Sequence, residues 1–214
     1  MSGLDGSNLT AKVYKSLRED ILSGKYPVGT ALTESMVAEE YAVSRTPVRE
    51  ALRQLELARL VKIIPNKGAV VEGITKKDLD DIYEIRLLIE RLAAEKAAKH
   101  ATPDDIAQLK EIIDLTDFYF ARQDFEKLKS MDGRFHEYIY ALSGRRILGD
   151  ILSDLHSLLI RFRGDSMRCV GRTEQTIREH RDILDALAAH DAKRAGELVN
   201  LHIANSYHNI LKLI

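Results

Sequence analysis

Proline is scarce in this chain, and its scarcity restricts the folds that the chain can adopt. Four prolines occur among 214 residues, and three of them lie before residue 70. Proline interrupts the interior of a helix, so the long stretches without it are free to be helical. Apolar residues recur through these stretches at intervals of three and four, which indicates helices with one buried face. We therefore expect a mainly α-helical protein.

The first sixty residues predict three helices. Apolar residues from Leu9 to Ile21 form one stripe, and Gly24 follows it as a typical C-terminal glycine. Thr33 can cap a short second helix, and Ser44 can cap a third that continues to Leu57. The second and third helices are therefore expected almost end to end.

A small β-hairpin is expected next. Residues 60–64 are rich in β-branched side chains, 65–68 have a turn composition, and 69–71 are again apolar. Three helices followed by a hairpin is the order of a winged helix-turn-helix, in which the third helix enters the major groove of DNA. We assign residues 8–73 to such a DNA-binding domain.

The rest of the chain, residues 76–214, is expected to be an all-α antiparallel bundle of six or seven helices. Turn-forming residues predict loops near 102–103, 143–144 and 164–171. The break at 73–75 separates this bundle from the winged helix-turn-helix.

The third helix carries three arginines at intervals of four, on the side opposite its apolar residues. A guanidinium fork can bind guanine O6 and N7 together, which makes Arg45 and Arg49 candidates for reading bases. The alternative is a solvent-exposed face on which the arginines pair with Glu50 and Glu56. The position of this helix within a winged helix-turn-helix favours the first interpretation.

Further candidate contacts to DNA lie at both edges of that surface. Small donors at a helix start suit phosphates, and residues at a hairpin tip can reach an adjacent groove. These candidates are Ser44, Thr46, Asn66, Lys67 and Gly68.

Composition limits the partners and the cellular compartment that we expect for this protein. The formal net charge is −1, so contacts to nucleic acid must come from local clusters of basic residues. The single cysteine, Cys169, excludes an intramolecular disulfide and a multi-cysteine zinc site. The first residues do not read as a secretory signal, and no apolar stretch approaches transmembrane length. We expect a cytoplasmic protein without a membrane partner.

A metal site is one interpretation of the histidines in the second half. Asp132 and His136 are four residues apart, so they project from one helix face, and His180 and His202 lie on two other predicted helices. One carboxylate and three imidazoles suit a divalent metal, with zinc first and nickel, manganese or iron as alternatives. Spacing alone favours the other interpretation, seven ordinary histidines that are half-exposed or hydrogen-bonded.

Arg86 lies at the edge of an apolar helix face and needs an anion if it is buried. Glu90, one turn later, is the partner that the sequence alone favours.

Two sets of segments resemble a known family. The stretch LTESMVAEEYAVSRTPVREALRQLELARLVKIIPNKGAVV resembles the signature of the GntR family of transcription regulators. The segments YEIRLLIERLAAEKAA, MDGRFHEYI and EHRDILDALAAHDAKRAGELVNLHI resemble the helical effector domain of its FadR-type (FCD) branch. The resemblance covers about residues 9–208, and Ser35 stands where an arginine is often found.

The resemblance implies several roles. Arg45 and Arg49 would contact operator DNA, Gly68 would approach it, and a homodimer would bind a short inverted repeat. In the metal-binding subset of the family, the ligand positions match Asp132, His136, His180 and His202, and Arg86 would point into the effector cavity. The remaining histidines, His100, His156, His190 and His208, match no ligand position.

The function expected from these features is sequence-specific control of a metabolic operon, with repression as the expected sign. A small organic acid would be the effector, held by the metal and by Arg86. A regulator that responds to the metal itself is an alternative. A metalloenzyme is a weaker one, because no dedicated general base or nucleophile accompanies the predicted ligands, and we expect no catalysis.

Overall fold

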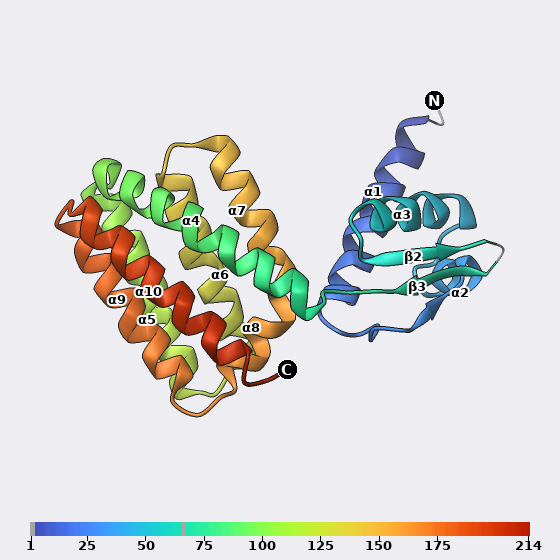
Figure 1. Cartoon of the computed structure of the whole chain (residues 1–214). Coiled ribbons are helices and arrows are strands. Elements are labelled where there is room, and N and C mark those ends of the chain that lie inside the picture. Colours follow the sequence, from blue (N-terminus) through green and yellow to red (C-terminus); the bar gives the residue numbers. More distant parts are fainter. Residues whose placement is uncertain (1–2, 66) are drawn as a thin grey trace. The chain divides into compact units, whose positions relative to one another are not determined.

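The structure, a computed structural model, describes residues 3–65 and 67–214 (Figure 1). The chain forms two compact units that divide between Thr75 and Lys76. Within the described residues, no helix is both long and apolar enough to cross a membrane.

The first unit has its core between α1 and α3, which pack against each other. Val13 and Leu17 of α1 and Val48 and Leu52 of α3 are buried, because the apolar residues of each helix recur on one face. The elements of this unit are α1 (Gly3–Leu22), β1 (Ala31–Leu32), α2 (Glu34–Glu40), α3 (Arg45–Leu57), β2 (Val61–Ile64) and β3 (Gly68–Val71).

The three strands form one antiparallel sheet in the order β1-β3-β2. Strands β2 and β3 are the predicted hairpin, with Val61 opposite Val71 and Ile64 opposite Gly68. Strand β1 was not predicted, because two residues are too few to show the alternation that identifies a strand.

The two expected helix caps differ. The Thr33 side chain accepts a hydrogen bond from the backbone N–H of Met36 at 3.2 Å, as expected for an N-cap. Ser44 occupies the N-cap position of α3, but its side chain makes no capping hydrogen bond, so the expected cap is absent.

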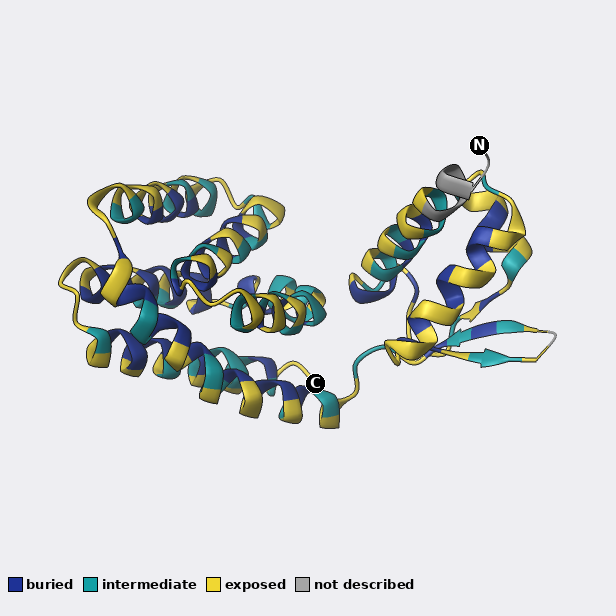
Figure 2. Ribbon diagram, turned by 90° about the horizontal axis from the view of Figure 1, so that it is seen from above, coloured by how far each residue is buried: buried dark blue, intermediate teal, exposed yellow. Residues whose placement is uncertain are grey.

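The second unit is a bundle of seven helices, and its buried residues face inward between them (Figure 2). The most extensive packing is between α4 and α10. The helices are α4 (Lys76–His100), α5 (Pro103–Ala121), α6 (Phe125–Leu142), α7 (Arg146–Leu158), α8 (Ile160–Met167), α9 (Arg172–Ala188) and α10 (Ala192–Ile210).

The loop predicted at 164–171 is partly wrong, because α8 continues through Gly164 to Met167. Glycine and serine weaken an isolated helix, but tertiary burial can override that preference. Ser166 and Met167 are buried in the bundle, and this burial accounts for the extra turn. Only the residues between Met167 and Arg172 connect α8 to α9.

Candidate nucleic-acid interface and candidate metal centre

Helix α3 presents an apolar face and a basic face. Val48 and Leu52 are buried, whereas Arg45, Arg49 and Arg53 are exposed on the other side. A row of guanidinium groups on one exposed face is suited to the edges of bases and to phosphates.

A cleft of about 570 Å³ opens between the start of α2, helix α3 and the tip of the hairpin. Ser44 and Thr46 are exposed at the start of α3, and they do not line the cleft. Asn66, also predicted to contact DNA, lies outside the described residues. The cleft brings together four of the predicted residues: Arg45, Arg49, Lys67 and Gly68.

Arg49 is held by a residue that the sequence analysis did not single out. Its Nε and Nη2 atoms donate to the two carboxylate oxygens of Glu34, each at 2.7 Å. Arg53, in contrast, pairs with Glu50 at 3.0 Å. The hydrogen bond from Arg49 is the main reason why the pKa of Glu34 is lowered. Because Glu34 occupies one edge of the Arg49 guanidinium, it fixes the plane in which the remaining Nη1 atom is presented.

Gly68 lies where only glycine fits. Its φ is +94°, and a Cβ atom there would lie 2.3 Å from the carbonyl oxygen of Leu32. Because Gly68 has no side chain, the start of β3 can lie directly beside the end of β1. This close approach fixes the path of the hairpin.

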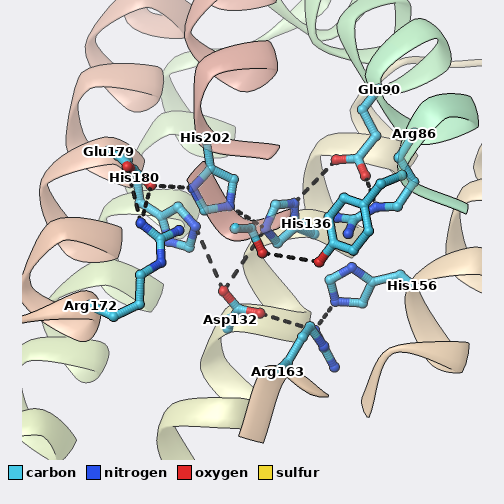
Figure 3. Close-up of polar contacts among 12 residues, drawn as sticks. Arg86, Glu90, Asp132, His136, His156, Arg163, Arg172, Glu179, His180 and His202 are labelled. Carbon is cyan, nitrogen blue, oxygen red and sulfur yellow. Dashed lines mark hydrogen bonds and ion pairs between the residues drawn. The ribbon is translucent and has the colours of Figure 1, made fainter. Parts of the chain in front are cut away.

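Four buried side chains of the second unit converge on one point (Figure 3). Helix α6 supplies Asp132 and His136, α9 supplies His180 and α10 supplies His202. One potential ligand atom from each lies within 4.8 Å of all the others. The cluster therefore joins three helices, and its residue types are those that bind divalent metals.

The distances show which atoms face the centre. The Nε2 atoms of His136 and His202 are 3.2 Å apart. Oδ1 of Asp132 lies 3.9 Å from Nε2 of His136 and 3.8 Å from Nε2 of His180. Three imidazole Nε2 atoms and one carboxylate oxygen thus share one small volume.

Carboxylates behind two of the imidazoles orient them. Glu179 accepts a hydrogen bond from Nδ1 of His202 at 2.7 Å, and Oε2 of Glu90 lies 3.5 Å from Nδ1 of His136. A proton on Nδ1 leaves the lone pair of Nε2 directed at the centre. The ring of His180 is fixed by stacking on Phe135, with centroids 3.9 Å apart.

The chemistry of the cluster fits a metal cation. Nε2 of His180 is buried and has no hydrogen-bond partner among the described residues. Burial is the main cause that holds the pKa of His180 well below its ordinary value, so the imidazole is neutral and can act as a ligand. Burial alone would raise the pKa of Asp132, but the positive groups that face it, Arg163 among them, together outweigh burial and lower that pKa.

Arg86 is fully buried and donates from Nε to Glu90 at 2.5 Å. This is the partner that the sequence alone favoured. Burial would raise the pKa of Glu90, but the charge of Arg86 and the contact with His136 together outweigh burial and lower it to about 2. Arg86 also lines a small cavity beside the cluster, together with Asp132, His136, His156, Arg163, Ser166, Met167, Arg172, Thr176, His202 and Ser206.

Several members of this site were not predicted from the sequence. His156 was set aside with the ordinary histidines, yet it is buried and its ring centroid lies 5.0 Å from that of His136. Arg163 and Arg172 also line the cavity, and no spacing pattern in the sequence distinguishes them from surface arginines. His100 and His208 are exposed, as expected for histidines without a role at the centre.

Known proteins with similar sequences are transcription regulators. The HTH-type regulator YdhC of Bacillus subtilis is 29% identical over 88% of this chain and 85% of its own length. The gluconate operon transcriptional repressor of the same species is 31% identical over 85% of this chain and 74% of its own length. The repressor RspR of Escherichia coli is 28% identical over 90% and 84% of the two chains.

The whole fold is also similar to a solved structure. McbR/YncC of E. coli superimposes with a TM-score of 0.81 at 25% identity, over 96% of this chain and 98% of that one. Residues 9–71 match the family described as bacterial regulatory proteins, gntR family, and residues 81–205, more than half of the chain, match the FCD domain. The relatives are regulators and not enzymes. This chain therefore belongs to the GntR family: it is a DNA-binding transcription regulator with an FCD domain as its second unit.

Proposed function

We propose that this regulator is a repressor of a metabolic operon, and that a small carboxylate bound at a metal centre in the FCD domain controls its affinity for DNA. The observation that carries the proposal is the buried set of one carboxylate and three imidazoles, backed by Glu90 and Glu179. Repression is supported by the names of two relatives, which are described as repressors.

Residues in the cleft of the first unit and at the start of α3 beside it would bind the operator. Arg45 and Arg49 would bind guanine edges, whereas Ser44, Thr46 and Lys67 would bind phosphates. Glu34 would hold the Arg49 guanidinium in one orientation. A fixed orientation favours a hydrogen bond to one base edge over a contact with a phosphate.

A homodimer would present two such clefts to an inverted repeat. Support comes from exposed apolar residues on two neighbouring helices, α4 and α7. Ile85, Leu88 and Leu92 are exposed at helical spacing on α4, and Ile147 and Ile151 are exposed on α7. Exposed apolar side chains grouped on neighbouring helices are typical of protein interfaces, so a second copy of this chain is the proposed occupant.

The metal would be zinc in the first instance, because zinc accepts imidazole and carboxylate ligands in a small coordination shell. When bound, it would supply a Lewis-acid anchor for an acid. Arg86 would then bind the same carboxylate, since its guanidinium lines the adjoining cavity.

Helix α4 offers a route from the effector to the DNA-binding unit. Arg86 and Glu90 both belong to α4, and α4 begins at Lys76, the first residue of the second unit. An effector that changes the Arg86–Glu90 pair acts directly on this helix. If the effector binds more tightly to one arrangement of the dimer, it would favour that arrangement and so set the affinity for DNA. A regulator of this kind acts in the cytoplasm, where operator and metabolites are both accessible.

Fluorescence anisotropy with a labelled duplex from the upstream region of its own gene tests the proposal. The zinc-loaded protein should bind this duplex more tightly than a random duplex at physiological salt, and small carboxylates should change that affinity. Arg49→Ala should reduce the preference roughly tenfold or more. Lys12→Ala, which removes an exposed charge outside the cleft, is the matched control.

Three outcomes would count against parts of the proposal. Equal affinity for both duplexes refutes operator recognition. A large response to zinc alone, with no further response to any acid, makes the metal the signal. Unchanged operator binding by Arg49→Ala removes that arginine from base recognition.

A further inference from the structure

Arg163 reaches the metal cluster from α8. Its side chain is only 10% exposed, and Nη1 donates to Oδ2 of Asp132 at 3.0 Å. The other oxygen of Asp132, Oδ1, faces His136 and His180. The guanidinium also lies against Gly133, where a Cβ would be 3.7 Å from Nη1. Arg163 therefore lies beside the proposed metal position without occupying the ligand oxygen.

Two donors in this corner lack an acceptor. Nε2 of His156 contacts Nη1 of Arg163, so it accepts and the His156 proton is on Nδ1. Both Nδ1 of His156 and Nε of Arg163 are buried without a hydrogen-bond partner among the described residues. Both residues line the same cavity (Figure 3). Unpaired buried donors are costly, and an anionic group that reached them would satisfy them.

Without a metal ion, the positive and negative side-chain charges around the cluster cancel. Three buried or nearly buried guanidiniums are each matched by one carboxylate, in pairs that carry no net charge. A divalent cation bound by three neutral imidazoles and Asp132 would leave two positive charges in excess. Uncompensated charge in a buried site is unfavourable, so two negative charges are needed with the metal. The pairs are Arg86–Glu90 at 2.5 Å, Arg163–Asp132 at 3.0 Å and Arg172–Glu179 at 3.1 Å.

We propose that the effector is a compact dianion whose second anionic group is bound by Arg163 and His156. This inference rests on the proposed function, since the first carboxylate would be held by the metal and Arg86. The free space in the cavity is about 20 Å³, close to the volume accessible around one water molecule. Even a short diacid is larger than this space, so its entry requires the Arg163 side chain to move, and a compact acid needs the smallest movement.

Isothermal titration calorimetry of the zinc-loaded protein, with isosteric pairs of acids, tests this inference. Malonate and succinate would each be compared with the corresponding monoamide, malonamate and succinamate, which differ by one charge at nearly constant size. The better-fitting dianion should bind roughly tenfold to a hundredfold more tightly than its monoamide, as expected for hydrogen bonds to a charged group.

Arg163→Gln should abolish most of that preference, so that the dianion and its monoamide bind with similar affinity. A purely structural role of Arg163 would weaken both acids equally. Arg161→Gln, on the same helix but exposed, should preserve the preference and is the matched control. Zinc content, measured for each protein, separates loss of the metal from loss of the second contact.

The outcomes distinguish this inference from the proposed function. Equal affinities for dianion and monoamide would overturn the dianion alone and leave acid sensing intact. Preservation of the preference in Arg163→Gln would also overturn it. Failure of all four acids to bind would overturn it together with acid sensing at the metal centre.

Discussion

Glu179 offers a direct test of the metal centre, because it contacts a proposed ligand without being one. It accepts from Nδ1 of His202 at 2.7 Å, from Asn205 at 2.6 Å and from Arg172 at 3.1 Å. Burial would raise the pKa of Glu179, but its bonds to His202 and Arg172 lower it to about 2, so it is ionised at neutral pH. Glu179→Gln removes this charge and keeps the size of the side chain.

The expected effect is a loss of zinc affinity of about 10- to 100-fold, the usual result of removing an outer carboxylate. This corresponds to about 1.4–2.7 kcal/mol of binding free energy. The negative charge of Glu179 stabilises the His202 imidazole when a cation polarises it, and an amide does so much less. The amide oxygen can still accept from Arg172, so the variant should fold.

Competition with a chromophoric zinc chelator measures this affinity for the parent protein and the variant. Glu174→Gln, an exposed change in the first turn of the same helix, should leave zinc affinity unchanged. Equal affinities of the parent and Glu179→Gln proteins would refute the argument that His202 is a ligand held by Glu179.

Two further substitutions test the packing that supports each site. Gly68→Ala should destabilise the first unit, as measured by thermal unfolding, and weaken operator binding, since its Cβ would lie 2.3 Å from the carbonyl oxygen of Leu32. Gly29→Ala, with φ +87° but open space around it, should cost only the left-handed backbone, about 1–2 kcal/mol, and an equal effect of both would contradict the steric argument. Glu90→Gln leaves the Arg86 charge buried without its partner and should lower the free energy of unfolding in urea by about 3–5 kcal/mol. Glu95→Gln, at a partly exposed pair on the same helix, should have little effect, and similar losses from both would refute the role of burial.

The fold was largely predictable, because helical periodicity and turn composition are local properties of the sequence. The three helices and the hairpin of the first unit lie where apolar spacing and the turn near residue 65 predicted them. Strand β1 and the last turn of helix α8 were missed for a shared reason. Both depend on contacts with distant residues: β1 exists through pairing with β3, and α8 extends past Gly164 because Met167 is buried.

The candidate metal site was predictable only in part. The interval between Asp132 and His136 places them on one helix face, which spacing alone reveals. The convergence of His180 and His202 on that face depends on how α9 and α10 pack, so it came from the family resemblance. His156 and Arg163 carry no such signal, because their roles arise from the turn between α7 and α8 at Leu159.

Glu179 shows most clearly why the surroundings of a site escape sequence analysis. Adjacent residues on a helix point about 100° apart, so a carboxylate next to His180 is expected to face away from whatever His180 binds. Glu179 contacts the Nδ1 atom of His202, because α10 packs against α9 and brings that atom to it. The two neighbours on α9 thus act on one centre from different directions, His180 as a proposed ligand and Glu179 through His202. The two side chains become parts of one site only because a second helix packs against α9. The spacing of residues along α9 alone does not predict this arrangement.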